Sequence, residues 1–180
     1  HTVELSPLTR PGGHPLPIGW GEGPGEGPRL TAKHFVIATG SVVSPPPLAA
    51  LEEVGYITSD HALSLKKLPK SLIVLGGGAI ACELAQFFAR FDVKVTQIQR
   101  NPHVLREFDD DAGAVVEAVF RREGIQLFTG TKLLNARRMG KRKVVEFLQD
   151  GTKRRVAADE ILLALGRTPN IAALGLARAG

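Results

Sequence analysis

The chain has 180 residues, of which 43% are hydrophobic, so it can form a core of ordinary size. Its 23 Lys and Arg against 18 Asp and Glu give a net charge of +5, which favours an anionic ligand but is too diffuse to indicate nucleic-acid binding. The single cysteine, Cys82, excludes an intrachain disulfide framework and fits a reducing compartment. Because the apolar runs are strand-sized and no signal peptide is visible, we expect a cytoplasmic protein without a membrane span.

The amino-terminal part of the chain offers few regular elements. Residues 1–32 are predicted to be a loop or linker, because the stretch RPGGHPLPIGWGEGPGEGPR is dominated by Gly and Pro. A β-rich apolar run, KHFVIATG, extends from Lys33 to Gly40 and is expected to form a strand that ends at the glycine. Further on, Ser59 or Asp60 is expected to cap a short helix.

From Ser71 onward, predicted strands and helices alternate, which indicates right-handed crossovers and a parallel sheet. The expected order is strand 71–75, helix 79–91, strand 94–98, helix 110–122 and strand 125–129. After Thr131 the helical period disappears, and we expect a hairpin that turns at Asp150-Gly151, then a buried strand over 160–165. The basic run RRMGKRK, Arg137 to Lys143, is interpreted as a solvated hairpin edge, with a polyanion or phosphate contact as the alternative.

A glycine-rich turn lies between the first of these strands and the first helix. Residues 76–81, GGGAIA, fit the pattern G-x-G-x-x-A. In such a turn Gly76 permits the tight bend, Gly78 removes a side chain that would block a pyrophosphate, and a small Ala81 lets the helix approach the strand. The helix N-terminus would offer free N–H groups and a partial positive charge to the phosphates. We therefore predict a dinucleotide site; a turn that serves packing alone is the alternative.

The end of the second strand bears on which nucleotide is bound. An NAD site usually has Asp or Glu there for the ribose 2′-hydroxyl, whereas a 2′-phosphate is better met by arginine. This strand ends in Gln99-Arg100, and Arg106 follows in the loop, so no carboxylate stands at that position. The pattern favours NADPH. If it is wrong, the two arginines are ordinary exposed loop residues.

Other polar residues are interpreted mainly as structural. Glu83 is expected in the first turn of the helix, where either a dipole contact or a nicotinamide contact would explain it. Cys82 is expected to be a small buried residue rather than a nucleophile. The histidines lack metal-ligand spacing, and the acidic run before the second helix is interpreted as capping and dipole compensation, so no metal site is predicted. These are His1, His14, His34, His61 and His103, and Glu107, Asp109, Asp110 and Asp111.

Three segments together resemble the pyridine nucleotide-disulfide oxidoreductases, and especially their mercuric reductase-like members. These are FVIATGS, VLGGGAIACELAQFFARF and ILLALGRTPN, and the resemblance extends from about Lys33 to Leu174. Two positions depart from it, because Ala79 stands where many members have a bulky aromatic and Leu165 replaces a common threonine. The family's first flavin motif, its redox-active cysteine pair and its dimerisation domain have no counterpart in the sequence. The resemblance therefore implies a central fragment of a longer enzyme.

The fold class expected from these observations is α/β: a Rossmann-like NAD(P)-binding domain with a parallel sheet and a β-hairpin or meander, flanked by partial FAD-domain segments. The predicted divisions are a linker over 1–32, a flavin-domain segment over 33–58, the NAD(P)-binding domain over 59–165 and a return to the flavin domain over 166–180. The predicted NADP contacts are Gly76, Gly77, Gly78, Ala79, Ile80, Ala81, Glu83, Gln99, Arg100, Arg106 and Gly166, with Ala38, Thr39 and Gly40 on the FAD side.

The resemblance implies that hydride passes from NADPH to FAD in the full-length parent, and that the fragment itself contains no catalytic residue. Its expected partners are the nicotinamide dinucleotide and the parent's flavin and dimerisation domains, with no nucleic acid and no membrane. The alternative is a stand-alone dinucleotide-binding or redox-sensing module without catalysis. A dehydrogenase with substrate residues in the amino-terminal loop is less favoured, because that loop offers no acid-base pair.

Overall fold

The computed structural model describes residues 2–4, 29–31, 34 and 36–176. The chain divides into two compact units, residues 43–167 and residues 1–42 with 168–180. In the second unit, β1 (Thr2–Glu4) pairs antiparallel with β2 (Arg29–Thr31). The expectation of no regular element in residues 1–32 is therefore wrong at its two ends, where β-prone residues lie at or beyond the border of the Gly- and Pro-rich stretch. Most of that stretch lies outside the described residues.

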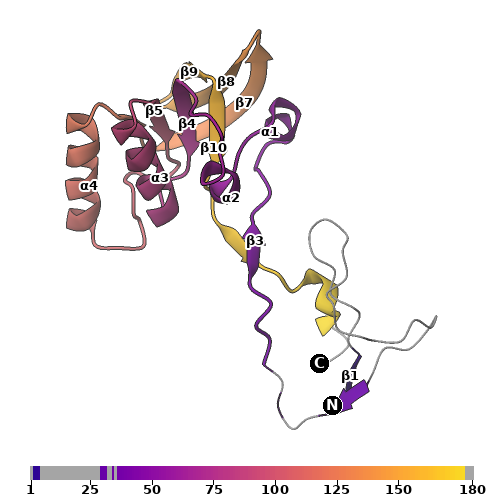
Figure 1. Ribbon diagram of the computed structural model, residues 1–180. Helices are drawn as coiled ribbons and strands as arrows, with labels where there is room; N and C mark the ends of the chain where they lie inside the picture. The colour runs from indigo at the N-terminus through magenta and orange to yellow at the C-terminus, as the bar shows by residue number, and fades with distance from the viewer. Residues whose placement is uncertain (1, 5–28, 32–33, 35, 177–180) are drawn as a thin grey trace. The chain divides into compact units, whose positions relative to one another are not determined.

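The unit of residues 43–167 is built on a parallel sheet with the strand order β10-β4-β5-β6 (Figure 1). Helix α3 connects β4 to β5 and α4 connects β5 to β6, whereas an antiparallel meander, β7-β8-β9, stands between β6 and β10. The bounds are β4 Ser71–Leu75, α3 Ala79–Arg90, β5 Lys94–Ile98, α4 Asp110–Arg122, β6 Gln126–Phe128, β7 Thr131–Met139, β8 Arg142–Gln149, β9 Thr152–Ala158 and β10 Glu160–Leu163.

Shorter elements complete the described chain. Helices α1 (Ala49–Val54) and α2 (Ser59–Ala62) precede β4. Strand β3 (Ser41–Val43) pairs with β11 (Arg167–Pro169), and a 3-10 turn, η1, covers Ala172–Leu174. No helix within the described ranges is long and apolar enough to cross a membrane.

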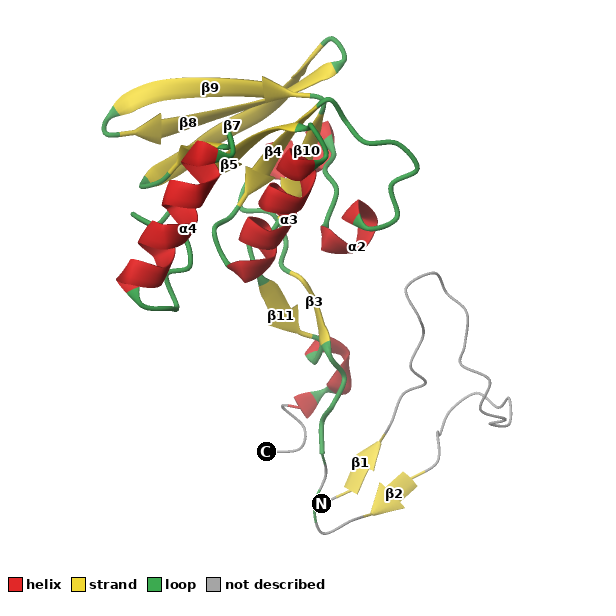
Figure 2. Ribbon diagram, turned by 60° about the vertical axis from the view of Figure 1, so that its left-hand side comes forward, coloured by secondary structure: helices red, strands yellow, loops and turns green. Residues whose placement is uncertain are grey.

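The parallel sheet is covered on both faces, which explains why every residue of β4 is buried. On one face, Leu72 and Val74 belong to a core that includes Phe88 of α3 and Phe120 of α4. On the other face, Ile73 and Leu75 belong to a core with residues of α1 and the meander. Figure 2 shows α3 and α4 side by side against the sheet, with the meander at the top of the view. The alternation of sides along β4 follows from the period of two in a strand.

The predicted α/β class, with a parallel sheet and a meander, is confirmed. Strands 71–75 and 94–98 and helix 110–122 have the expected bounds. The hairpin between β8 and β9 turns at Asp150 and Gly151, whose φ angles of 49° and 73° suit the tight two-residue turn that such a pair favours. The basic run Arg137 to Lys143 forms the β7-β8 hairpin around Gly140, as interpreted from the sequence, but Lys143 is only 6% exposed and pairs with Glu160, so this end of the run is not solvated.

Three local predictions are wrong. The buried strand expected over 160–165 ends at Leu163, and Leu165 is 37% exposed. Residues 36–40 of the run KHFVIATG form no strand, and the strand begins only at Ser41. Val36 is 92% exposed and Ile37 is 52% exposed, so β-prone residues there have nothing to pack against. Helix α2 has Thr58 at its N-cap rather than Ser59 or Asp60, and the Thr58 N–H donates to His61 Nδ1 at 3.3 Å. The helix therefore begins one residue earlier than the cap residues suggested.

Candidate functional site

The glycine turn lies at the point where the order of the strands in the sheet reverses. From β4 the chain proceeds to β5 and β6 on one side, and the later strand β10 pairs with β4 on the other side. The segments that leave the carboxyl ends of β4 and β10 therefore lie next to each other, and they are Gly76–Gly78 and Ala164–Gly166. In open parallel sheets this switch point is where ligands bind.

At two of the three positions, packing within the fold itself requires a glycine. Gly76 has a φ of 128°, and a Cβ there would lie 2.2 Å from the carbonyl oxygen of Ala164. A Cβ on Gly77 would lie 2.6 Å from the side chain of Gln99. Any larger residue would thus force the backbone of Ala164, directly after β10, or the packed Gln99 to move.

Packing within the described fold does not require a glycine at position 78. Its φ of −78° is available to any residue, and a Cβ built there meets no described atom within 4 Å. The space beside Gly78 is open, and it lies at the N-terminus of α3, where Gly78 is the N-cap and provides no side-chain cap. A small residue is required there only if something else occupies that space.

The N-terminus of α3 presents free donors. The first backbone bond into the helix is from Cys82 N–H to Gly78 C=O, at 3.0 Å. No acceptor within the described residues is recorded for the N–H groups of Gly77, Gly78 and Ala79. Ala81 is completely buried, and its Cβ would lie 3.5 Å from a Cβ on Gly76, so the helix starts close to the turn. Free amides and the helix dipole together favour an anion at this place.

The loop after β5 is fixed against this turn. Leu105 N–H donates to Gly77 C=O at 2.6 Å, and Val104 N–H donates to the Glu117 carboxylate of α4 at 3.1 Å. His103 Nε2 lies 3.2 Å from an Asp110 carboxylate oxygen, in the first turn of α4. Leu105 has a φ of 55°, a conformation that a leucine adopts only when its surroundings impose it. These contacts hold the loop at the edge of the site, and the Glu117 contact was not predicted.

The two arginines of this loop are available for a ligand. Arg100 and Arg106 are both exposed, and neither has an ion-pair partner in the described part of the chain. Arg106 directly follows the anchored Leu105, and Arg100 directly follows Gln99. Gln99 itself is only 7% exposed, and its Oε1 accepts from the Arg100 N–H at 2.8 Å. Its side chain therefore supports the loop and Gly77 and is not free in this conformation.

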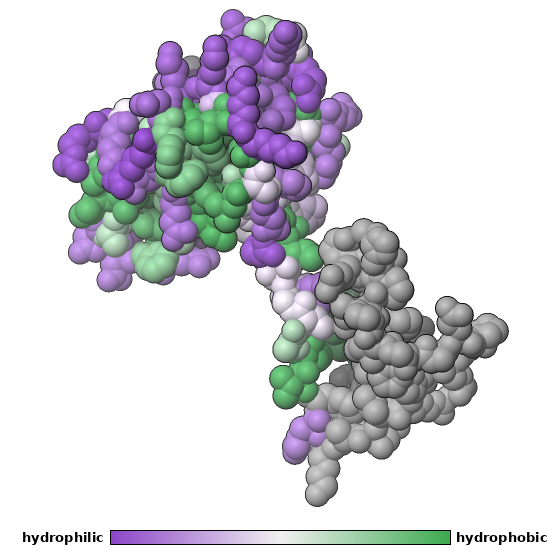
Figure 3. All heavy atoms as spheres, viewed as in Figure 1, coloured by the Kyte–Doolittle hydropathy of each residue, from purple (hydrophilic) through white to green (hydrophobic). Residues whose placement is uncertain are grey.

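Glu83 is placed differently from the prediction. Helix α3 begins at Ala79 and has no acidic residue in its first turn, so Glu83 lies in the second turn and its carboxylate is not a helix-dipole contact. It borders a shallow surface hollow together with Phe87, Arg90 and Phe91. Ile80, Phe87 and Phe91 are each more than 40% exposed, and Figure 3 shows apolar side chains gathered over α3 with hydrophilic ones around them.

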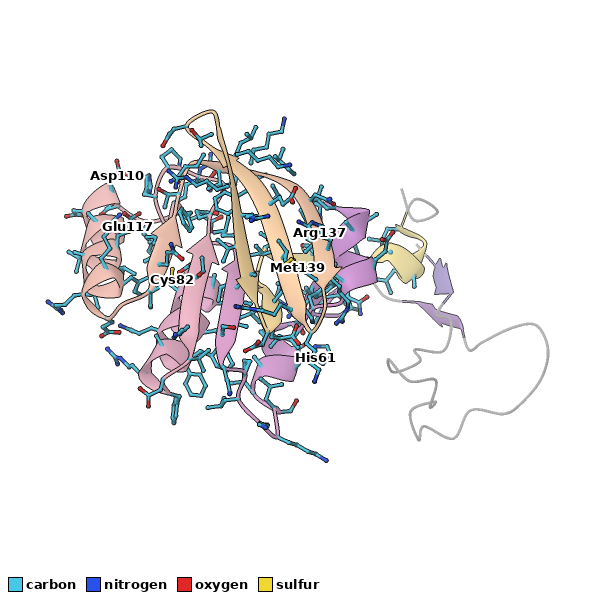
Figure 4. The ribbon with its side chains drawn as sticks, turned by 90° about the horizontal axis from the view of Figure 1, so that it is seen from above. His61, Cys82, Asp110, Glu117, Arg137 and Met139 are labelled. Atoms are coloured by element: carbon cyan, nitrogen blue, oxygen red, sulfur yellow. The ribbon has the colours of Figure 1, made fainter. Side chains whose placement is uncertain are left out.

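Cys82 and Gln97 lie beneath the turn, as Figure 4 shows for the labelled Cys82 between α3 and the sheet. Cys82 is 6% exposed, as expected for a small buried residue, and burial raises the pKa of its thiol. It is therefore a protonated, unreactive thiol at neutral pH. Gln97 is fully buried and donates from Nε2 to Gly76 C=O at 2.9 Å. No role for Gln97 was predicted from the sequence.

The remaining predicted residues lie in separate places. Gly166 belongs to the unit of residues 43–167, has a φ of 122° and accepts from Ser44 N–H at 3.1 Å. Ala38, Thr39 and Gly40 belong to the other unit, where Gly40 C=O accepts from Asn170 N–H at 2.9 Å and Thr39 Oγ1 is buried without a partner among the described residues. In the described ranges, no group of three His, Cys, Asp or Glu could hold a metal ion.

The geometry defines a Rossmann-type α/β fold, with an open space and free amide donors at its switch point. The model of the family "Pyridine nucleotide-disulphide oxidoreductase" matches residues 6–180. The chain therefore belongs to the pyridine nucleotide-disulphide oxidoreductases, as its motifs suggested.

Individual relatives agree with this assignment. The chain is 38% identical over 154 residues to mercuric reductase of Lysinibacillus sphaericus, covering 86% of this chain and 28% of the relative. It is 35% identical over 153 residues to mitochondrial dihydrolipoyl dehydrogenase of Schizosaccharomyces pombe, covering 84% and 30%. The structure of an engineered water-forming NADPH oxidase bound to NADPH superposes with a TM-score of 0.69 at 25% identity, covering 82% and 33%. The chain thus spans about a third or less of the length of these proteins.

Proposed function

We propose that residues 59–165 are the NADPH-binding domain of a flavin-dependent oxidoreductase of the mercuric reductase type. Residues 33–58 and 166–180 would then belong to its flavin-binding part, with Ala38, Thr39 and Gly40 on the FAD side. In the complete enzyme, hydride would pass from the nicotinamide to FAD. The fragment would bind the nucleotide and orient it, and we assign it no catalytic residue.

The observation that carries this proposal is the open space at Gly78. Of three consecutive glycines, this one alone has an ordinary φ and no described neighbour within 4 Å of a built Cβ. The N–H groups around it have no acceptor within the described residues. A pyrophosphate would fill the space and accept from those donors, which explains both features at once. We assign Gly76 to Ala81 and Gly166 to this contact.

The choice of NADPH over NADH rests on Arg100 and Arg106. Both guanidinium groups are exposed, lack an ion-pair partner within the described part of the chain and belong to the loop anchored at Gly77. The engineered NADPH oxidase offers a parallel, because its substitutions remove an aspartate, introduce an arginine at the next position and introduce a second arginine six positions further on. Gln99, Arg100 and Arg106 have the same order and spacing. Two arginines can neutralise a 2′-phosphate and donate several hydrogen bonds to it.

Glu83 is the proposed contact on the nicotinamide side, since it is exposed in the second helical turn of α3, which follows the free N–H groups of the glycine turn. The neutral, buried Cys82 takes no part in electron transfer and fits a reducing cytoplasm. Disulfide chemistry would need two further thiols near the flavin, and we assign these to the rest of the parent enzyme.

The proposal is tested by calorimetric titration of the chain with NADPH and with NADH. We expect NADPH to bind more tightly, by at least the roughly tenfold that one charge-assisted hydrogen bond of about 1.5 kcal/mol provides. Equal affinities would contradict the NADPH assignment while leaving a dinucleotide site. No binding of either nucleotide would contradict the whole proposal.

A further inference from the structure

Gln97 is an unusual residue at the centre of this sheet. It lies on β5, is fully buried and stands between residues that are 8% exposed or less. Its Oε1 has no hydrogen-bond partner among the described residues. A buried amide oxygen without a partner destabilises the folded state, and an apolar residue would avoid that cost. Burial of the side chain therefore does not by itself explain why a glutamine is present.

The other end of the same side chain contacts the glycine turn. Gln97 Nε2 donates to Gly76 C=O at 2.9 Å and lies 3.7 Å from Cys82 Sγ. The Cys82 thiol in turn lies 3.7 Å from Gly77 C=O, within reach of a weak S–H···O bond. Gly77 C=O also accepts from Leu105 N–H at 2.6 Å. The carbonyls of two successive glycines are thus occupied by donors from the protein interior and from the anchored loop.

Because the peptide unit is planar, these contacts determine the direction in which the N–H groups of the glycine turn point. A trans peptide unit is planar, and its C=O and N–H groups point in opposite directions. The described chain contains no cis peptide bond. When Gln97 holds Gly76 C=O, the N–H of Gly77 must point to the other side of the same peptide plane. When Leu105 and Cys82 hold Gly77 C=O, the same follows for the N–H of Gly78.

The third carbonyl of the turn obeys the same arrangement. Gly78 C=O accepts from Cys82 N–H at 3.0 Å as the first bond of α3, so the Ala79 N–H points away from the helix. Three consecutive carbonyl oxygens are therefore occupied, and three consecutive N–H groups are left without an acceptor in the described residues. Successive free N–H groups of this kind make an anion-binding concavity, whereas a carbonyl turned toward the anion would repel it.

We propose that Gln97 is a positioning residue for the pyrophosphate site, which it prepares by holding the Gly76 carbonyl away from the ligand, with the Cys82 thiol as a weaker second support. The proposal rests on the nucleotide-binding function proposed above. Gln97 does not touch the ligand in this arrangement. It fixes which face of the Gly76-Gly77 peptide the phosphate meets, and the open acceptor Oε1 is the cost of placing an amide donor in the core.

The test compares two ligands that share the arginine contacts but differ at the turn. NADP+ has a pyrophosphate, whereas 2′-AMP has only the 2′-phosphate and no group that reaches the turn. Gln97→Met keeps the length of the side chain and removes the donor. The matched control is Thr96→Val, because Thr96 is also buried on β5 but its hydroxyl donates to Gln126 Oε1, away from the turn.

We expect Gln97→Met to weaken NADP+ binding by about tenfold, because the Gly76 carbonyl loses the donor that holds it away from the phosphate, and to leave 2′-AMP binding within about twofold. Thr96→Val should leave both affinities unchanged. The proposal is overturned if Gln97→Met binds NADP+ as tightly as the original chain does. It is also overturned if both ligands weaken equally, because that result indicates a general structural role.

A second variant keeps the test decisive if Gln97→Met folds poorly. Gln97→Glu preserves the shape of the side chain and can donate only when its carboxyl is protonated. We expect its NADP+ affinity, expressed as a ratio to the original chain at each pH, to be poor at pH 8 and to improve as the pH falls and the buried carboxyl takes up a proton. A ratio that does not change with pH would contradict the proposal. If the original chain binds no NADP+ at all, the proposed function fails first.

Discussion

Replacing Gly78 by valine separates a ligand site from a simple turn. The φ of −78° at this position is accessible to valine, and the new Cβ meets no described atom within 4 Å. The new Cβ therefore causes no clash with the described atoms. Its cost is that of a poor N-cap, about 0.5–1 kcal/mol. For a protein of this size, 1 kcal/mol corresponds to about 2–4 °C in Tm, so the unliganded Tm should fall by no more than about 4 °C.

Ligand binding should respond quite differently. A ligand present at 100 times its Kd stabilises the folded state by about 2.7 kcal/mol. At about 2–4 °C per kcal/mol, NADPH should therefore raise the Tm of the original chain by about 5–11 °C. The valine side chain would fill the space that the phosphate oxygens need, so the shift should vanish in the variant. The assay is a thermal melt of both proteins with and without NADPH.

The control is Gly76→Val, which should destabilise the protein even without a ligand. Its φ of 128° and its 2.2 Å approach to the Ala164 carbonyl make any side chain costly, so the unliganded Tm itself should fall sharply. The reasoning about Gly78 is refuted if its valine variant shows the same NADPH-induced shift as the original chain. It is equally refuted if the unliganded Tm falls as far as in the Gly76 variant.

Three further outcomes follow from the described contacts. Arg100→Ala and Arg106→Ala should each lower the affinity for NADPH by about tenfold or more and leave the affinity for NADH nearly unchanged in calorimetric titration. Lys141→Ala at the β7-β8 hairpin is the control, and an equal loss of affinity for NADH would contradict this expectation. Asp159→Ala should lower the free energy of unfolding by about 1–3 kcal/mol in urea titration, because its carboxylate accepts from the Ser71 N–H and hydroxyl, both at 3.0 Å, and joins β4 to β10. Hydrogen bonds from Arg90 and then Gln86 lower the pKa of Glu123, so this group contributes stability above its unfolded pKa that is lost as the pH falls through its lower folded pKa. Glu123→Gln should make the Tm less sensitive to pH in that acidic range, and an unchanged pH profile would disprove the role of the Arg90 contact.

The alternation of strands and helices after Ser71 was predictable because each element carries a strong local pattern. Helix 110–122 has acidic residues at its start and basic residues at its end, and β4 is a continuous apolar run. The strand predicted at Val36 and Ile37 did not form, because strand propensity acts only where a partner strand exists and these side chains are exposed.

The site was predictable only in part, for a related reason. The pattern of glycines identified the turn, but it could not distinguish Gly76, constrained by Ala164 from 88 positions along the chain, from Gly78, constrained by nothing described. Gln97 gave no signal, because within KVTQIQR a glutamine resembles any polar residue of a strand. Its contact with Gly76 C=O spans 21 positions and exists only after β5 has paired with β4. Sequence patterns encode local geometry, whereas these contacts arise from the pairing of distant segments.

The meander changes how the net charge of the protein should be understood. Residues 131–158 contain nine Lys and Arg against Asp and Glu at only two positions, a net charge of +7 in a chain whose total is +5. The rest of the chain, including the strands and helices around the glycine turn, is therefore slightly acidic as a whole. The overall positive charge does not by itself draw a nucleotide to the switch point. Selectivity for a phosphate there must come from donors at short range, while long-range attraction of anions in solution is directed toward the meander.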